Sequence, residues 1–361
     1  MKYLLRKMKH TITRPLRIAV KYIRLKRRRA LEFPLTIQLP ITYSCNMDCV
    51  MCGMHHMTGR RDFTAQELRT ILQDKLFSRV QGIGVNGGEP FLKNDLNECI
   101  TAMAETLPSL RHFSFISNGY FTDRILTRLR EIRPVCREHG IMLHLSLSVD
   151  GVKDMQDFHR GCPGAWDHVN ETMKRILADK SSYVDGLDII CTITRHNIER
   201  INEVAAWAES LGVRAAYNIA TENVRIENED RVKDFSLFSD EHSRMLAQEF
   251  FYGQYLKTGS QRFFAIYLFL RTGKRYAPCP CMYNEWITLT PDSQIGFCAT
   301  HSKNLGSGLE RSAWSIVQDN IPYLHEIREK FCRTCSHYMY TLDLDGYRMM
   351  LDDRCRNAFM R

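Results

Sequence analysis

Short apolar runs alternate with amphipathic stretches along residues 34–219. Six runs are rich in apolar residues and have the length of strands, at 34–44, 82–86, 112–116, 142–149, 187–194 and 213–219. The stretches between them have helical spacing, at 64–77, 95–106, 122–138, 164–179 and 199–211, and the first opens on a capping box, Thr64 to Glu67. Strands that alternate with helices form parallel sheets, and apolar residues on both strand faces fit a sheet buried under helices. The pattern therefore predicts an α/β fold.

Polar or glycine-rich turns follow the predicted strands. They are Gly87-Gly88-Glu89-Pro90, Ser117-Asn118-Gly119, Ser148 to Gly151, and Asn218. Because the carboxyl ends of parallel strands form ligand-binding sites, we expect these residues to surround one mouth. Gly87 and Gly88 let a backbone approach a ligand closely, and Glu89 can accept hydrogen bonds from an ammonium group. The alternative for this turn is an ordinary connection from strand to helix.

Three cysteines follow the first strand, in the spacing Cys45-x3-Cys49-x2-Cys52. A loop of this size can place three thiolates around a four-iron cluster and leave the fourth iron open. The alternative is three buried thiols, because free cysteine is among the most buried residue types. The chain has 13 cysteines and no evident export signal, which indicates metal binding in a reducing, cytoplasmic compartment rather than disulfides.

Together these features resemble the radical S-adenosylmethionine (SAM) superfamily. The motifs that carry the resemblance are the Cys45–Cys52 loop, Gly87–Pro90, Ser117–Gly119, Ser148–Gly151 and His159-Arg160-Gly161. The resemblance implies a partial (β/α)6 TIM-type barrel over residues 34–222. It also implies a 4Fe–4S cluster on Cys45, Cys49 and Cys52, with SAM bound to the open iron.

The resemblance also implies a chemistry and a set of SAM contacts. An electron from a flavodoxin- or ferredoxin-like reductant would pass through the cluster and cleave SAM. The resulting 5′-deoxyadenosyl radical would take a hydrogen atom from a substrate. The residues that would contact SAM are Gly87, Gly88, Glu89, Pro90, Ser117, Asn118, Ser148 and Asp150. Met51 stands where the family usually has an aromatic residue, and we expect it to cover the adenine side.

The C-terminal part carries a second group of cysteines. Residues 223–275 read as a helical connector whose apolar residues form a core stripe, Phe235, Leu237, Phe238, Met245, Leu246, Phe250 and Phe251. Residues 276–361, with a strand-turn-strand pattern at 286–298, resemble the SPASM or shorter twitch extension of radical SAM enzymes. The ligands implied for one auxiliary 4Fe–4S cluster are Cys281, Cys298, Cys332 and Cys335, with Cys279 and Cys355 as further candidates. Thr341 and Asp345 stand where a full SPASM domain has more cysteines, and zinc is the alternative metal.

Residues 1–33 form a basic N-terminal arm. Residues 1–29 hold twelve Lys or Arg and no acidic residue, and spaced apolar residues predict an amphipathic helix over 1–32. Such a helix can contact an anionic membrane surface or an acidic partner, or it can pack on its own barrel. Nucleic acid is not an expected partner, because no binding motif accompanies the charge. No apolar run reaches the roughly 18 residues of a membrane span. With the cytoplasmic compartment that the cysteines indicate, membrane-peripheral contact through the arm stays an option.

We expect an oxidoreductase-type radical SAM enzyme that oxidises a small-molecule or carbohydrate substrate or forms a bond in it. An auxiliary cluster favours this chemistry, and residues 1–33 are too few for a peptide-recognition domain. The alternatives are a SPASM maturase of peptides or proteins, a non-catalytic iron–sulfur electron-transfer or sensor protein, and a basic binding module with structural zinc. Candidate hydrogen donors are Cys162, Cys191 and Tyr217, although packing is the favoured explanation for each of the three. Candidate bases are Asp150 and Asp292.

Overall fold

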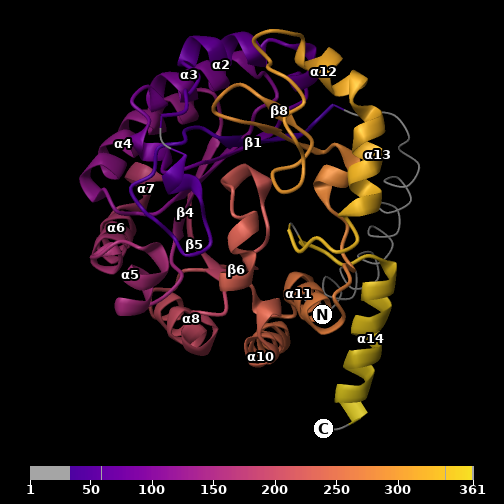
Figure 1. The fold of residues 1–361 in the computed structure, drawn as a ribbon. Helices are drawn as coiled ribbons and strands as arrows, with labels where there is room; N and C mark the ends of the chain where they lie inside the picture. The colour runs from indigo at the N-terminus through magenta and orange to yellow at the C-terminus, as the bar shows by residue number, and fades with distance from the viewer. Residues whose placement is uncertain (1–32, 58, 338, 360–361) are drawn as a thin grey trace, which may run out of the picture.

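Six parallel strands form the main sheet of the computed structural model, which describes residues 33–57, 59–337 and 339–359. The helix expected over residues 1–32 lies outside this part of the chain. The strands are β1 (Thr36–Pro40), β2 (Gly82–Asn86), β3 (His112–Ser117), β4 (Met142–Ser148), β5 (Gly186–Ile193) and β6 (Ala215–Ile219). Each pairs in parallel with the next. The expected α/β fold is confirmed, and Figure 1 shows the strands as a partial barrel.

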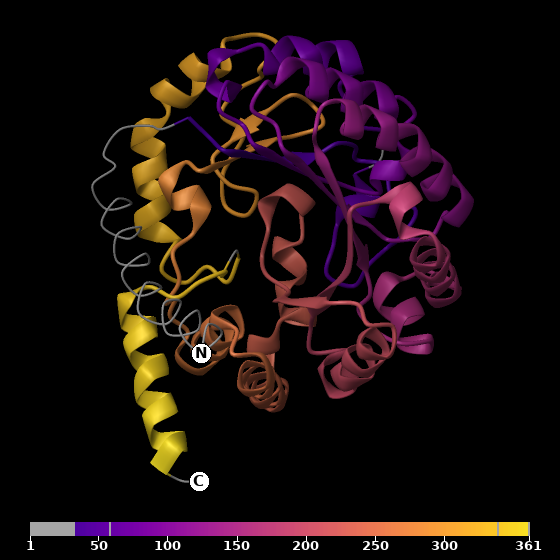
Figure 2. The same ribbon diagram turned by 180° about the vertical axis from the view of Figure 1, so that it is seen from behind.

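Helices cover the outer face of this barrel (Figures 1 and 2). In chain order they are α2 (Ala65–Leu72), α3 (Leu96–Thr106), α4 (Thr122–Glu138), α5 (Asp154–Arg160), α6 (Ala165–Ala178), α7 (Lys180–Tyr183) and α8 (Ile201–Ser210). The predicted capping box opens α2: the Thr64 hydroxyl accepts from the Glu67 N–H, and the Glu67 carboxylate accepts from the Thr64 N–H. The local sequence therefore fixes the start of this helix.

The hydrophobic core lies between the sheet and these helices. On β3, Phe113 and Phe115 are fully buried in the core, whereas the alternating Ser114 and Ile116 are partly exposed. Successive side chains of a strand point to opposite faces. Ser114 and Ile116 therefore face the inside of the barrel.

The C-terminal hairpin extends the same sheet. β7 (Trp286–Leu289) pairs with β8 (Ile295–Gly296) in antiparallel fashion, as the strand-turn-strand pattern predicted. β7 also pairs in parallel with β1, with Trp286 opposite Thr36, which gives the order β6-β5-β4-β3-β2-β1-β7-β8. The cysteine-rich end is thereby attached beside the strand that leads to Cys45.

The remaining helices lie at the end of β6 and along one side of the molecule (Figures 1 and 2). They are α9 (Val232–Phe235), α10 (Glu241–Thr258), α11 (Gln261–Thr272), α12 (Ala313–Asp319), α13 (Ile321–Lys330) and α14 (Leu344–Phe359). The short 3-10 helices are η1 (Met54–His56), η2 (Lys75–Phe77), η3 (Pro90–Leu92), η4 (Ile198–Arg200), η5 (Val224–Ile226), η6 (Glu229–Arg231), η7 (Leu237–Ser239) and η8 (Pro280–Tyr283). The expected core stripe of the connector is partly wrong, because Phe238 is 45% and Met245 is 52% exposed.

No helix within the described ranges combines the length and apolar character that crossing a membrane requires.

Candidate active site

The three cysteines of the first loop lie together after β1. Cys49 packs with Met47 and with Ala165 at the start of α6, and Cys45 and Cys52 pack against the same group. The Cys52 N–H donates to the Cys49 carbonyl at 3.0 Å, which closes the turn between them. The spacing predicted from the sequence therefore gathers three thiols in one turn.

Burial opposes ionisation of these thiols. It raises the pKa of Cys45 to about 12 and that of Cys49 to about 12, and the charge of neighbouring thiols adds to both shifts. The Met54 N–H donates to the Cys52 sulfur at 3.4 Å. Because a bound metal deprotonates its thiol ligands, this loop suits thiolates that are neutralised by a metal rather than free nucleophiles.

The two glycines after β2 lie against the cysteine loop. A Cβ on Gly88 would lie 2.1 Å from the Ser44 carbonyl oxygen, and one on Gly87 would lie 2.5 Å from that of Thr42. Gly87 also has φ +134°, a conformation that favours glycine. The sequence assigned these glycines to the approach of a ligand; in the structure, the backbone that approaches them is that of the loop leading to Cys45.

Glu89 links the turns after β2 and β3. Its carboxylate accepts hydrogen bonds from the Phe91 N–H at 3.2 Å, the Ser117 hydroxyl at 2.9 Å and the Asn118 N–H at 2.7 Å. Burial raises the pKa of Glu89 to about 7, although these bonds favour the charged form. The residue thus positions Ser117 and Asn118, and its own contact with SAM stays a prediction.

Asn118 also reaches the cysteine loop. Its Nδ2–H donates to Asn46 Oδ1 at 2.8 Å. The Asn46 Nδ2–H group itself is buried and has no hydrogen-bond partner among the described residues. A buried N–H without an acceptor costs about 1–3 kcal/mol. An acceptor supplied by a ligand beside Cys45 would remove that cost, so this atom fits an occupied site.

A buried charged group lies behind the loop, after β4. Asp150 is fully buried and accepts from the Thr192 N–H at 2.6 Å, while His159 Nδ1 and Arg160 Nη2 lie 3.0 and 2.6 Å from its carboxylate. Burial raises the pKa of Asp150, but Arg160 and His159 outweigh it, so the pKa is lowered overall. The carboxylate is thus ionised and fully bonded, which does not favour the base role considered for Asp150. Arg160 continues to Cys49, where Nη1 donates to Sγ at 3.7 Å.

A segment after β6 covers the cysteine loop and was missed in the sequence. The Ile226 carbonyl accepts from the Gly53 N–H at 2.9 Å, Asn228 Nδ2 donates to the Met51 carbonyl at 2.8 Å, and Arg231 donates to the Cys52 carbonyl at 3.4 Å. A Cβ on Gly53 would lie 2.5 Å from the Glu227 carbonyl oxygen, so the contact requires glycine. The polar residues of 223–231 were the only signal within a stretch assigned to the connector.

The candidate donors and bases fall in different surroundings. Cys162 packs against the Cys49 group, beside the loop. Cys191 is fully buried in the core, and Tyr217 is 3% exposed and packs on Phe250 and Phe263, so packing accounts for both.

Asp292 lies in the turn of the C-terminal hairpin. It accepts from the Tyr43 hydroxyl at 2.8 Å and from the Thr290 hydroxyl at 2.5 Å. These bonds tie the turn to the chain just before Cys45. The contacts of Asp292 therefore fit a structural link, and its role as a base stays a prediction.

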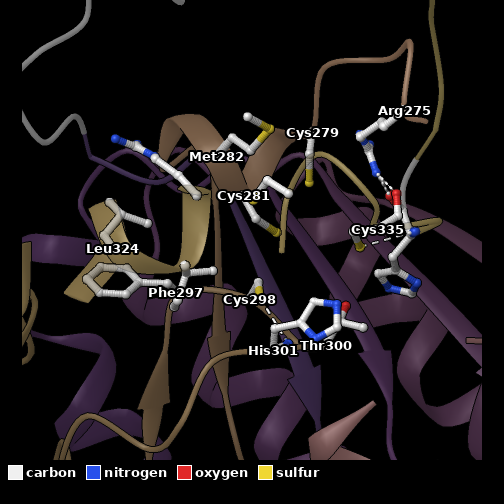
Figure 3. Close-up of a pocket in the computed structure, with 14 residues that line it drawn as sticks. Arg275, Cys279, Cys281, Met282, Phe297, Cys298, Thr300, His301, Leu324 and Cys335 are labelled. Carbon is white, nitrogen blue, oxygen red and sulfur yellow. Dashed lines mark hydrogen bonds between the residues drawn. The ribbon is translucent and has the colours of Figure 1, made fainter. Parts of the chain in front are cut away.

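Five cysteines line one pocket of the C-terminal part (Figure 3). They are the four implied ligands, Cys281, Cys298, Cys332 and Cys335, together with Cys279. Cys355 is exposed on α14 and does not line this pocket. The fold therefore brings five thiols to this pocket, one more than a four-iron cluster binds.

The lining of this pocket suits sulfur ligands. Backbone N–H groups of His301 and His337 donate to Cys298 Sγ at 3.3 Å and Cys335 Sγ at 3.4 Å. Arg275 donates to the carbonyl oxygens of Cys335 and His337, which holds that loop over the pocket (Figure 3). Within the described part of the chain, no three Cys, His, Asp or Glu side chains already have the geometry to hold a single metal ion. The five cysteine thiols and these N–H···S bonds are therefore the observations that fit an iron–sulfur cluster.

Comparison with known proteins agrees with this arrangement. Residues 39–208 match the family model described as the radical SAM superfamily. The chain is 24% identical over 323 residues to the mycofactocin maturase MftC of Mycobacterium tuberculosis. This match covers 86% of this chain and 78% of the maturase. It is 26% identical over 99 residues to a probable GTP 3′,8-cyclase of Sulfolobus acidocaldarius, a match that covers 26% of this chain and 30% of the cyclase.

Solved structures show the same fold. Streptococcus suis SuiB bound to its precursor peptide SuiA aligns with a TM-score of 0.60 at 16% identity, over 88% of this chain and 71% of that one. Native anSMEcpe with bound AdoMet and a peptide aligns with a TM-score of 0.59 at 16% identity, over 90% and 99% of the two chains.

Proposed function

Because the chain belongs to the radical SAM superfamily, we propose that it is an enzyme that modifies a peptide or protein by abstracting a hydrogen atom from it. The cofactors of this family are a 4Fe–4S cluster and SAM. When bound, they supply an electron that cleaves SAM and a 5′-deoxyadenosyl radical that takes the hydrogen atom.

Cys45, Cys49 and Cys52 would hold the SAM-binding cluster. The single observation that carries this assignment is the gathering of three thiols, one buried and two partly exposed, in one turn beside two buried donors. These donors, Asn46 Nδ2 and Arg160 Nε, have no acceptor among the described residues. Three thiol ligands leave one iron for SAM.

The turns at the carboxyl ends of β2, β3 and β4 would hold SAM. Glu89 fixes the turn after β3, so Ser117 and Asn118 can present a hydroxyl and an amide to the carboxylate or ribose of SAM. The other proposed contacts are Gly87, Gly88, Pro90, Ser148, Asp150 and Met51. Asp150 would act through Arg160, since its carboxylate is already bonded.

The C-terminal pocket would hold one auxiliary 4Fe–4S cluster. Cys281, Cys298, Cys332 and Cys335 are the proposed ligands, and Cys279 is a fifth thiol at the same pocket. Zinc on four of these cysteines is the alternative. An absorption spectrum and the iron content of the purified protein distinguish the two metals.

The relatives favour a peptide substrate. The sequence had favoured a small molecule or carbohydrate, with a maturase as the alternative. The chain matches a mycofactocin maturase over most of its length, whereas the cyclase match is limited to about a quarter of it. The peptide-bound structures of SuiB and anSMEcpe share its fold. We therefore propose the maturase alternative, with a flavodoxin- or ferredoxin-like reductant, and leave open whether the net reaction is an oxidation.

Reductive cleavage of SAM tests the proposed activity. Anaerobically reconstituted protein with dithionite and SAM should release 5′-deoxyadenosine, measured by liquid chromatography and mass spectrometry. Cys49→Ala should release none, while Cys355→Ala, an exposed thiol outside both sites, should match the wild type. Release that survives Cys49→Ala would contradict the assignment.

Co-expression tests the substrate class. The enzyme would be produced with the short reading frames that flank its gene, and the peptides would be analysed by mass spectrometry. A mass change that requires Cys49 supports a peptide substrate. Deoxyadenosine formation that is stimulated by a sugar or nucleotide but by none of these peptides would favour the small-molecule alternative.

A further inference from the structure

Arg160 joins the cysteine loop to the buried charged group behind it. Its Nη2 lies 2.6 Å from the Asp150 carboxylate, and its Nη1 donates to Cys49 Sγ at 3.7 Å. The residue is only 8% exposed, and its Nε–H has no hydrogen-bond partner among the residues that the structure describes. One guanidinium therefore connects a carboxylate to a proposed cluster ligand and keeps one donor unused.

The contacts of Asp150 hold the guanidinium in this place. The Thr192 N–H donates to one carboxylate oxygen at 2.6 Å, and His159 Nδ1 lies 3.0 Å from the other. His159 is fixed in turn by Thr194, whose hydroxyl lies 3.0 Å from Nε2. These bonds to both of its oxygens keep the Asp150 carboxylate from rotating away from Arg160. Arg160 is therefore held with its remaining donors close to the cysteine loop.

The fold alone does not account for this arrangement. A buried ion pair generally stabilises a protein no more than apolar packing of the same volume does. A buried N–H without an acceptor costs about 1–3 kcal/mol. The cost is removed if Nε–H finds an acceptor that is present only when the site is loaded. A 4Fe–4S cluster on three thiolates is anionic, and its sulfur atoms accept hydrogen bonds.

Building on the proposed function, we propose that Arg160 is a positioning residue that raises the reduction potential of the cluster held by Cys45, Cys49 and Cys52. Its positive charge and its N–H···S bonds stabilise the reduced cluster, which carries one more negative charge than the oxidised cluster. Asp150 lies on the far side of the guanidinium, fixes its position and partly offsets its charge. The arrangement eases the transfer of one electron from the reductant to the cluster.

A redox titration followed by electron paramagnetic resonance tests this role. The background is the 361-residue chain with Cys298→Ala, Cys332→Ala and Cys335→Ala, which leaves only two thiols, Cys279 and Cys281, at the C-terminal pocket. The remaining signal then belongs to the cluster at Cys45–Cys52. Arg160→Gln should lower the ratio of reduced to oxidised cluster at least tenfold at a fixed solution potential, which corresponds to about 59 mV for one electron. Arg160→Lys, which keeps the charge but has fewer donors, should show a smaller loss.

A second arginine of the same site provides the matched control. Arg231 donates to the carbonyl oxygens of Val50 and Cys52, at 3.2 and 3.4 Å. Its described hydrogen bonds include none to the sulfur atoms of the three loop cysteines. Arg231→Gln removes one positive charge near the loop, and we expect a change of less than threefold. Equal effects of Arg160→Gln and Arg231→Gln would overturn the specific role of Arg160.

The sign of the effect gives a further test. Asp150→Asn removes the negative charge behind the guanidinium, so the reduced fraction should rise where that of Arg160→Gln falls. If Arg160→Gln assembles no cluster, the comparison of Arg160→Lys with the wild type decides, and equal potentials overturn the proposal. A wild-type chain with no SAM-responsive cluster signal would instead contradict the proposed function itself.

Discussion

The polar residues around the cysteine loop form hydrogen bonds and ion pairs with one another. Glu89 accepts three bonds from its own chain, and Asp150 accepts from Thr192, His159 and Arg160. A buried carboxylate requires such partners, because an unpaired charge is costly to remove from water. The sequence motifs therefore name residues that the fold brings together, whereas their division into ligand contacts and positioning residues depends on the fold.

Glu89 should make stability depend on pH. Burial, opposed by its hydrogen bonds, raises its pKa from 4.5 to about 7. The stability that this group contributes is present below about pH 4.5 and is lost as the pH rises to about 7, because the folded state binds the proton more tightly. Glu89→Gln carries no titrating group. Between about pH 5 and pH 7.5 the unfolding free energy of the wild-type apoprotein should fall by up to about 3 kcal/mol relative to this variant. Urea denaturation at both pH values measures this, and parallel curves would contradict it.

Gly88 should tolerate no side chain. A Cβ there would lie 2.1 Å from the Ser44 carbonyl oxygen, so Gly88→Ala must displace the chain that leads to Cys45. We expect a loss of stability of about 2 kcal/mol or more and poor retention of iron at the first loop. Gly253→Ala is the control, because its Cβ meets nothing within 4 Å inside α10, and it should leave stability equal or slightly higher. Thermal unfolding and iron analysis compare the two, and equal behaviour would exclude the close contact as the cause.

At the scale of elements, the alternation of strands and helices was predictable from periodicity. Both the capping box of α2 and the hairpin β7–β8 follow local sequence signals. The pairing of β7 with β1 was not predictable, because no local pattern indicates which distant strand completes a sheet edge. The segment at 223–231 was missed for the same reason: its bonds to Met51, Cys52 and Gly53 join positions far apart in the chain.

Asn228 should hold this segment on the cysteine loop. Its amide donates to the Met51 carbonyl, and its Oδ1 accepts from the Asn223 N–H at 2.8 Å. Asn228→Ala should lower the unfolding free energy by about 1–3 kcal/mol, because the buried Asn223 N–H and the partly buried Met51 carbonyl lose their partners. It should also alter the spectrum of the first cluster. Asn320→Ala, which removes a side-chain bond to the Ile316 carbonyl in α12, should leave that spectrum unchanged. Identical spectra of both variants would show that the segment does not shape the site.

On the scale of the whole molecule, one sheet carries both cysteine sites. β1 leads to the first loop, and β7, paired with β1, follows Cys279 and Cys281 and precedes Cys298. The segment at 223–231 connects the sites further, because the Val224 N–H donates to the Thr300 carbonyl at 3.0 Å. The C-terminal part is therefore built onto the edge of the barrel, which the sequence presented as a separate region.

The two sites should nevertheless hold separate metal. We expect about eight irons per wild-type chain, four for each cluster. Cys298→Ala, Cys332→Ala and Cys335→Ala together remove three of the five thiols of the C-terminal pocket and should leave about four irons and the signal of the first cluster. Cys355→Ala should leave about eight, since this thiol lies outside the pocket. Iron analysis decides, and zinc in place of iron in the wild-type C-terminal pocket would contradict the auxiliary cluster.

The most direct measurement is electron–nuclear double resonance on the reduced first cluster with SAM labelled with ¹⁵N at its amino group. An iron left open by Cys45, Cys49 and Cys52 should bind that nitrogen and show a ¹⁵N hyperfine coupling in the Cys298→Ala, Cys332→Ala, Cys335→Ala chain. The coupling should disappear when Cys49→Ala is added. A reduced cluster in the otherwise intact loop that shows no coupling to labelled SAM would contradict the account.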